Sequence, residues 1–551
     1  MKKIIGVVIL VLIIASVVFY KYFTDSKKQK TIDAINYASK PQQLSVTGFS
    51  GYTLDTVTID GEKIPVIRIP LVTWGGYAAL FAANNGIQPN KESLFYKNGK
   101  FVVELVRDED PNSHLSNYAK GKYPIIWSTV DTMPLLYDVF KNDKRVIPQV
   151  FGIFDWSYGG DGIIAREYIK TPKDLKGKRI VVAGNTPSNF FLLWVLAQSN
   201  LTPSDVMIQY VSDAITAKDA YLNDTKVDAC VTWSPFLYEI TDPTAKTYVA
   251  GSRLLITSRD ANQLISDCYL ARLDFTKDHP EIIEAFSKSM MEGADLLEQN
   301  KQKVFNAMAE LFKLPGGAHE ASLMLEDVHI ANFPENMMIF DSENPISAFK
   351  IFFLAQEYYK NAGSLPDTAS YDAEAVINIT ALKKFQSKKM FASQQNTVKT
   401  SFNKQGNFSI ADLESKRTVL TEDIQLHFDA AQVDFNINSP RDEIVQNRKH
   451  LSKIAEQMNV LGTTVVKLIG HLDTTKVEEF KAQGQQIFIE ASAQAKLISK
   501  KRAEFIKKIL VEQYQCDEQR IFTEGKGWDQ PIDPNDQTKN RRVEVKFLSF
   551  E

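Results

Sequence analysis

The sequence predicts an α/β protein in three parts: an N-terminal transmembrane helix, a two-lobed α/β domain, and an α+β domain with the order β-α-β-α-β-β. Three observations lead to this prediction. An apolar run stands near the N-terminus, buried strands alternate with helices through the middle of the chain, and the C-terminal segment has its own order of strands and helices. A chain of 551 residues is also too long for one hydrophobic core.

Composition excludes several classes of function. The hydrophobic fraction of 44% and the charged fraction of 24% are ordinary for a globular protein, and a net charge of -3 provides no basic field for nucleic acid. The three cysteines are too few and too scattered for a disulfide framework. The sequence has no CxxC, HExxH or GxSxG motif, and its histidines are dispersed, so we expect no metal, no cofactor and no enzymatic activity.

The first element is an almost wholly apolar run from Ile4 to Phe23. A run of about 20 such residues can cross the bilayer as a helix. It exceeds the apolar core of a cleaved signal peptide and lacks a small-x-small site near its end, which predicts an uncleaved anchor over 1–23. Lysines stand on both flanks, so charge does not fix the orientation. Residues 24–59 are predicted to form a juxtamembrane spacer.

The middle segment, 60–383, repeats the order strand, turn, helix. Predicted buried strands cover Ile64 to Thr73, Phe101 to Val106, Pro124 to Val130 and Arg179 to Ala183. This alternation predicts open α/β sheets of parallel strands, whose ligands bind at the carboxyl ends of the strands.

Small polar residues follow these strands where helices should begin. Their hydroxyls and the free backbone N–H groups would point into one crevice, which suits an anionic group. The alternative is that they only cap helices. The residues are Thr73, Ser128, Thr129, Thr186, Ser188 and Asn189.

Tryptophans are concentrated in the same segment, four of them beside predicted strand ends. Aromatic walls with a few polar groups describe a small-molecule pocket, although each tryptophan taken singly is more often core. Trp194 lies within a predicted helix and is interpreted as core. The other four are Trp74, Trp127, Trp156 and Trp233.

Four motifs carry a family resemblance: Trp74-Gly75-Gly76-Tyr77, Ser157-Tyr158-Gly159-Gly160-Asp161-Gly162-Ile163, Asp174-Leu175-Lys176-Gly177-Lys178, and the segment from Val227 to Pro235. They resemble periplasmic substrate-binding proteins of the nitrate, sulfonate and taurine type, which share their fold with thiamine-precursor-binding proteins. The resemblance implies a periplasmic-binding-protein type II-like domain whose two lobes are joined by two crossing strands and close on a ligand. That ligand would be a small oxoanion, a sulfonate or a heteroaromatic. The predicted ligand-binding residues are Trp74, Gly75, Tyr77, Ser128, Thr129, Ser157, Gly159, Gly160, Thr186, Ser188 and Trp233.

A polar segment over 384–421 is predicted to be a linker, and 422–551 a separate domain. Four pieces of this domain resemble the signature of OmpA-like peptidoglycan-binding domains. They are Gly470-His471-Leu472-Asp473, Ser499-Lys500-Lys501-Arg502-Ala503, Gly525-Lys526-Gly527-Trp528-Asp529-Gln530-Pro531 and Asn540-Arg541-Arg542-Val543-Glu544.

The resemblance assigns roles to four residues. Asp473 would take the ammonium and Arg502 the carboxylate of diaminopimelate in the cell wall, while Asn540 and Arg542 would support the site from the last strand. Asp473 and Arg502 are unusually far apart, because a segment rich in Lys, Glu and Gln is inserted between them. The insert could extend the helix, cover the pocket or serve another contact.

Together the resemblances imply a single-pass inner-membrane protein with most of its chain in the periplasm. It would bind diaminopimelate-type peptidoglycan and a small-molecule solute, report to a membrane-protein partner, and bind no nucleic acid. Three alternatives remain open: an uptake receptor for an ABC transporter, a structural scaffold without ligand, and a component of an envelope motor or channel. The last is weakened because the apolar run contains no Asp or Glu.

Overall fold

The computed structural model describes residues 43–261, 263–398, 418–424 and 432–549, together with residues 41, 413, 426 and 428. The predicted membrane anchor, 1–23, lies outside the described residues. Within the described ranges, no helix combines the length and the apolar character needed to cross a membrane.

The first lobe contains two sheets. One has the order β12-β5-β11-β4 with antiparallel neighbours, and the other has the order β1-β2-β3, whose pair β2 and β3 is parallel. The strands are β1 (Thr56–Ile59), β2 (Glu62–Leu71), β3 (Val102–Arg107), β4 (Ile125–Thr129), β5 (Pro148–Ser157), β11 (Ser266–Arg272) and β12 (Val328–Ile330).

Helices surround these sheets. They are α2 (Ala78–Asn84), α3 (Leu94–Gly99), α4 (Pro111–Ala119), α5 (Met133–Phe140), α9 (Leu273–Asp278), α10 (Pro280–Phe312), α11 (Gly317–Glu326), α12 (Phe333–Ile339), α13 (Ala348–Asn361) and α14 (Thr380–Ser387). Ser50 N donates to Ala119 O (3.1 Å), so the described end of the predicted spacer packs on this lobe. The predicted linker begins inside α14.

The second lobe is built on a five-stranded sheet with the order β10-β6-β9-β7-β8. Strand β7 pairs in parallel with β8 and β9, whereas β6 pairs antiparallel with β9 and β10. The strands are β6 (Asp161–Arg166), β7 (Arg179–Ala183), β8 (Met207–Val211), β9 (Ala229–Trp233) and β10 (Ser252–Thr257), and the helices are α6 (Pro187–Gln198), α7 (Ala214–Asn223) and α8 (Phe236–Thr241).

Two crossings join the lobes, one from β5 to β6 and one from β10 to β11. At the first crossing Gly159 has a φ of +108°, which favours glycine. A hydrogen bond joins the two crossings, since Ser157 Oγ lies 2.7 Å from Ser258 Oγ. The prediction of parallel strands is correct for β2 with β3 and for β7 with β8 and β9. It is wrong for the strands at the crossings, because β11 runs antiparallel to β4 and β5, and β6 runs antiparallel to β9 and β10.

The C-terminal domain has a four-stranded sheet with the order β13-β16-β14-β15. Its chain order is β-α-β-α-β-β, as predicted, with a short extra helix before the second long helix and another before the last strand. The strands are β13 (Thr418–Ile424), β14 (Thr464–His471), β15 (Ile521–Gly527) and β16 (Val543–Ser549), and the helices are α16 (Asp442–Val460), α17 (Val477–Ala482), α18 (Gln485–Glu512) and α19 (Gln537–Asn540).

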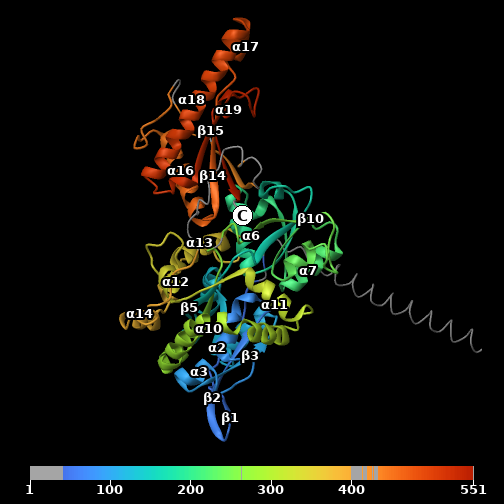
Figure 1. Cartoon of the computed structure of the whole chain (residues 1–551), viewed down its shortest axis with the longest axis vertical. Coiled ribbons are helices and arrows are strands. Elements are labelled where there is room, and N and C mark those ends of the chain that lie inside the picture. Colours follow the sequence, from blue (N-terminus) through green and yellow to red (C-terminus); the bar gives the residue numbers. More distant parts are fainter. Residues whose placement is uncertain are drawn as a thin grey trace, which may run out of the picture.

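This domain packs on the second lobe, at the end of the molecule opposite to β1 and β2 (Figure 1). The apolar contact places Val419, Leu420 and Leu461 against Trp194 and Ile256. Three hydrogen bonds flank it: Gln457 Nε2 to Gln198 Oε1 (3.0 Å), Lys453 Nζ to Asn200 Oδ1 (2.6 Å) and Thr463 Oγ1 to Arg259 O (3.2 Å). The second lobe and the C-terminal domain therefore share one hydrophobic core.

Candidate functional site

A cavity lies between the two lobes, where the carboxyl ends of several strands meet. It is narrow, because its walls leave a free volume of about 20 Å³, roughly the room of one water molecule. The first lobe contributes Val72, Trp74, Trp127, Ile265 and Asp267, and the second lobe contributes Asp161, Pro187 and Trp233. Three indole rings and two carboxylates, drawn from both lobes, therefore face one small space.

Trp74 is held in place by the hinge. A Cβ atom on Gly160 would lie 2.3 Å from Trp74 Cη2, so only glycine allows the indole to pack this closely on the crossing segment. Trp74 Nε1 donates to Asp155 Oδ2 (3.1 Å). The Trp74 ring is thus fixed from two sides by the protein itself.

The first-lobe carboxylates form a pair across two strands. Asp267 on β11 is the direct cross-strand partner of Asp155 on β5, and both are at least 96% buried. Burial, together with the charge of the other carboxyl, raises the pKa of Asp267 well above its usual range, and burial likewise raises the pKa of Asp155. A proton shared between the two groups relieves this repulsion.

Asp161 begins the second lobe. Its backbone N–H donates to Ser157 Oγ (3.0 Å), and its carboxylate accepts from Ser188 Oγ (3.2 Å) at the start of α6. Burial raises the pKa of Asp161 to about 7, and burial raises that of Asp131, which lies between β4 and α5, to a similar value. The cleft therefore concentrates acidic groups rather than basic ones.

The structure places only two of the predicted ligand-binding residues, Trp74 and Trp233, in the cavity wall. The others lie behind the wall or at the hinge. Tyr77 stacks on Phe154 and meets the edge of Trp127, and a Cβ on Gly75 would lie 2.3 Å from Met324 O.

The predicted hydroxyl residues contact other groups of the protein. Ser128 Oγ and Thr129 Oγ1 both contact Thr132 Oγ1 (2.6 and 3.3 Å), and Thr186 Oγ1 donates to Ala183 O (2.8 Å). Ser188 is engaged by Asp161. None of these hydroxyls lines the cavity, because each bonds to another group of the protein instead.

Sequence reasoning missed Asp161 and Asp267 as site residues. Asp161 stands inside the glycine-rich motif after Gly160, so its position beside a predicted hinge was an available signal. Asp267 had no local signal, because its role comes from its cross-strand neighbour Asp155, more than a hundred positions earlier in the chain.

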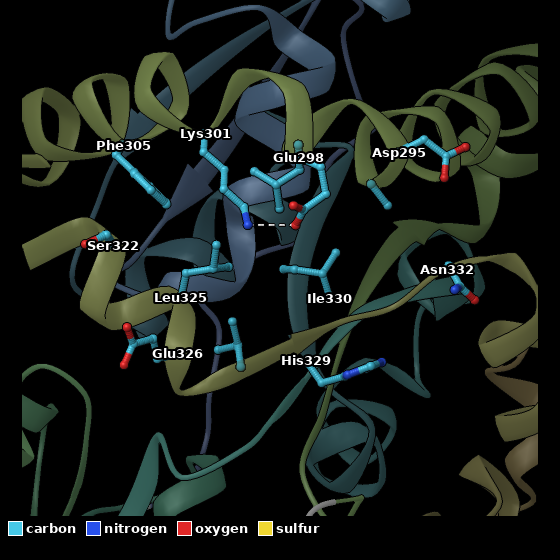
Figure 2. A pocket seen from close by; sticks show the side chains of 13 residues that line it. Asp295, Glu298, Lys301, Phe305, Ser322, Leu325, Glu326, His329, Ile330 and Asn332 are labelled. Carbon is cyan, nitrogen blue, oxygen red and sulfur yellow. Dashed lines mark ion pairs between the residues drawn. The ribbon is translucent and has the colours of Figure 1, made fainter. Parts of the chain in front are cut away.

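A second, wider hollow lies on the first lobe between α10, α11 and β12 (Figure 2). Its volume is about 560 Å³. Lys301 Nζ pairs with Glu298 Oε1 (2.8 Å) across its upper wall (Figure 2). Because this hollow is lined by the first lobe alone and by no tryptophan, the cavity between the lobes is the better candidate for a solute site.

In the C-terminal domain, Asp473 and Arg502 come close to each other with a third residue, Arg541. Arg541 Nη1 lies 3.4 Å from Asp473 Oδ2. Burial acts to raise the pKa of Asp473, but hydrogen bonds from Thr475 and the charge of Arg541 outweigh it and lower that pKa. Burial and the charge of Arg541 lower the pKa of Arg502, against the opposing charge of Asp473.

Arg502 is nearly buried. Its Nε donates to Gln432 O (3.0 Å), and its guanidinium lies 4.8 Å from the ring centre of Phe428. The predicted pair is thus joined by a second arginine that the sequence analysis did not assign to the site.

Asn540 and Arg542 organise the loop before the last strand. Asn540 Oδ1 accepts from Ile532 N (2.8 Å), its Nδ2 donates to Asp533 O (2.7 Å), and Arg542 donates to Gln530 O (3.4 Å). Both side chains are buried, so they fix the segment that presents Arg541.

The insert between Asp473 and Arg502 forms α17 and the first turns of α18. Of the possibilities left open, extension of the helix is what the structure has. Trp528 anchors the insert by stacking with Phe480 (5.9 Å between ring centres) and with Phe488 (6.4 Å).

Comparison with known families agrees with this architecture. Residues 91–303 match the family model described as "NMT1/THI5 like", and residues 442–544 match the model of the OmpA family. The chain therefore contains an NMT1/THI5-like domain followed by an OmpA family domain, as the two resemblances predicted.

Curated relatives match part of the first of these domains. A protein of Brucella abortus (strain 2308), named as a binding protein, is 25% identical over 156 residues, which are 28% of this chain and 47% of the relative. The taurine-binding periplasmic protein of Escherichia coli (strain K12) is 24% identical over 27% of this chain and 44% of its own. The chain spans about half the length of these relatives. The relatives are named as binding proteins, in agreement with the expectation that this chain is not an enzyme.

Two solved structures illustrate the similarity of the first domain. The alkanesulfonate-binding protein SsuA from Xanthomonas axonopodis pv. citri, bound to MOPS, is 18% identical with a TM-score of 0.44, and the match covers 57% of this chain and 98% of that one. The periplasmic nitrate-binding protein NrtA from Synechocystis PCC 6803 is 13% identical with a TM-score of 0.44, over 60% of this chain and 91% of that one.

Proposed function

We propose that this protein is a periplasmic solute-binding protein that is tethered to peptidoglycan through its C-terminal domain and to the inner membrane through Ile4 to Phe23. The observation that carries the proposal is the cavity between the lobes. Trp74 and Trp127 come from one lobe and Trp233 from the other, so a bound solute would bridge the two lobes and favour their closure.

The peptidoglycan tether is supported by Asp473, Arg502 and Arg541. Diaminopimelate carries an ammonium and a carboxylate on one side chain. Asp473 offers the ammonium a carboxylate with a lowered pKa, and the two guanidinium groups offer donors to the carboxylate. The long Arg541 to Asp473 contact of 3.4 Å is one that a ligand can replace.

The inner-membrane anchor and the periplasmic location rest on the apolar run and on the OmpA family domain. A reporter enzyme fused after Glu551 tests the topology. We expect activity only from a reporter that works outside the cytoplasm, and activity of a cytoplasmic reporter would invert the arrangement.

For the role of the solute, we favour sensing or scaffolding over delivery to an ABC transporter. A protein held at both the membrane and the wall diffuses poorly, whereas ligand-driven closure can be reported through the anchor to a membrane partner. The names of the relatives suggest taurine, alkanesulfonates or nitrate as ligands. A heteroaromatic ring would suit the indole walls better than an oxoanion suits Asp161 and Asp267.

The experiment that tests solute binding is a thermal-shift screen of the full chain against oxoanions, sulfonates, pyrimidines and ammonium compounds. We expect at least one class to stabilise the wild-type protein and to stabilise a Trp233→Ala variant less. If no compound shifts the unfolding temperature, the solute-binding proposal fails and a structural spacer is favoured.

A further inference from the structure

The polar groups that line the interlobe cavity are acidic. Among the described residues, its wall contains Asp161 and Asp267 and no lysine, arginine or histidine. Asp267 is 4% exposed and Asp161 is 3% exposed, so water does little to screen their charges. Asp155, the cross-strand partner of Asp267, adds a third buried carboxyl beside the wall.

Two arginines near the cleft are already engaged by carboxylates. Arg107 Nε donates to Glu109 Oε1 (2.8 Å), and the same Glu109 accepts from Thr73 Oγ1 (2.6 Å), next to Trp74. Arg259 Nη2 lies 3.9 Å from Asp327 Oδ1 at the hinge. Neither guanidinium lines the cavity, so neither supplies the positive charge that an anionic solute would need.

The helix N-terminus that faces the cavity is also occupied by the chain itself. Pro187 begins α6 and lines the cavity, and the next residue, Ser188, donates to the carboxylate of Asp161. A helix N-terminus attracts an anion, and here Asp161 takes that place. An added oxoanion would have to displace Asp161 or lie beside it.

From this arrangement we propose that the interlobe cavity, widened by separation of the two lobes, binds an organic ammonium cation with alkyl groups on its nitrogen. Trp74, Trp127 and Trp233 provide the aromatic faces that attract such a cation. Asp267 and Asp161 provide its counter-charge by releasing a proton when the cation binds. The inference rests on the proposed solute-binding function and names its ligand class.

The rest of the lining favours an alkylated ammonium over a metal ion. Val72, Pro187 and Ile265 complete the wall with apolar surface that suits methyl groups but offers a metal no ligand. In the described part of the chain, no three His, Cys, Asp or Glu side chains converge as a metal site. The cation would therefore be bound by indole faces and carboxylates.

The test is titration of the full chain by calorimetry and tryptophan fluorescence with four probes: choline, tetramethylammonium, ethanesulfonate, and the neutral isostere of choline in which carbon replaces nitrogen. We expect choline or tetramethylammonium to bind, the isostere to bind at least about 10-fold more weakly than choline, and ethanesulfonate to give no signal. Asp267→Asn should weaken cation binding by about 10-fold or more. Glu298→Gln, in the wider hollow on the first lobe, should leave cation binding unchanged.

Equal binding of choline and its isostere would overturn the inference, and so would binding of ethanesulfonate without either cation. In those cases solute binding itself stands, because a ligand has been found. If neither cation binds, the inference also falls, while the proposed function falls only if the wider thermal-shift screen is empty as well. Should Asp267→Asn fail to unfold cooperatively, Asp161→Asn and Trp233→Ala provide the same comparison.

Discussion

Asp161 and Asp267 illustrate how the cleft is arranged at the scale of single residues. Buried carboxylates cost folding free energy unless they are protonated or paired. Here burial raises their pKa, and Asp131 and Asp155 surround them with further acidic groups. A cation that neutralises them would recover part of this free energy, which couples binding to the stability of the ligand-free protein.

Asp161 gives a prediction for pH. Its pKa is about 7 in the folded protein and near the ordinary 3.8 in the unfolded chain, so the folded state keeps a proton that the unfolded chain loses between these values. Stability from this group is therefore present at low pH and is lost as pH rises toward about 7. Urea unfolding without ligand measures the free energy of unfolding at about pH 5 and at about pH 8. Between these two pH values, we expect Asp161→Asn to lose less of this free energy than the wild-type protein loses.

Both proteins contain the other titratable groups of this region, Asp131, Asp155, Asp267 and His329. The difference between their two losses in unfolding free energy therefore reports on Asp161 alone. An identical loss in the two proteins would mean that Asp161 is ionised over the whole range.

Asp473 and Arg502 give a prediction for the wall. Asp473→Ala and Arg502→Ala should each abolish pull-down by diaminopimelate-type peptidoglycan, because each removes one charge partner of the ligand. Arg541→Ala should weaken it. Lys500→Ala, which changes an exposed charge on the same helix, is the matched control. Unchanged pull-down by both Asp473→Ala and Arg502→Ala would contradict the assignment.

At the residue scale, sequence analysis could predict the aromatic members of the site but not its charges. Trp74 and Trp233 follow buried strands directly, and the rule that ligands bind at carboxyl ends of strands is local. The predicted hydroxyls do not line this cavity, because a Ser or Thr after a strand can bond equally well to nearby groups of its own chain, and their role in ligand binding stays a prediction. Asp267 becomes part of the site only through strand pairing between distant segments.

At the scale of elements, the crossing from β5 to β6 carries the most specific constraint. Gly160 lies against the Trp74 ring, and a Cβ there would come within 2.3 Å of it. Gly160→Ala should displace the ring, cost on the order of 1 to 3 kcal/mol of stability, and weaken solute binding. Gly51→Ala is the matched control, because its Cβ would meet nothing within 4 Å.

Thermal unfolding and ligand titration measure the two effects separately. Wild-type affinity in Gly160→Ala would show that the position of Trp74 is not set by the hinge.

The elements themselves were largely predictable. The order β-α-β-α-β-β of the C-terminal domain follows from alternating apolar patterns and is confirmed. The antiparallel strands were not predictable, because the directions of β6 and β11 depend on the chain crossing between lobes twice. The conformation of the insert was also not predictable, because the contacts of Phe480 and Phe488 with Trp528 form only in the folded domain.

At the scale of the whole molecule, the contact between the C-terminal domain and the second lobe determines what would move on closure. The three polar contacts go to Gln198, Asn200 and the Arg259 carbonyl, in the second lobe and at the hinge. Closure of the lobes would therefore move the C-terminal domain together with the second lobe, relative to the first. Solute binding and the wall tether would then be mechanically linked.

Paired spin labels test this linkage. The native cysteines are buried, so cysteines introduced at exposed Lys97, Lys176 and Lys500 can be labelled selectively. On addition of a bound solute, we expect the distance from 97 to 500 to change and the distance from 176 to 500 to stay constant. A change in the second distance would show that the C-terminal domain is not fixed on the second lobe.

Hydrogen exchange of the full chain, with choline and with peptidoglycan sacculi added separately, tests the central claim most directly. Choline is predicted to protect the segments around Trp74, Trp127, Asp161, Trp233 and Asp267, and sacculi the segments around Asp473, Arg502 and Arg541. Protection by choline outside the interlobe segments, or by sacculi outside the C-terminal domain, would contradict a chain that holds a solute between its lobes and the wall at its far end.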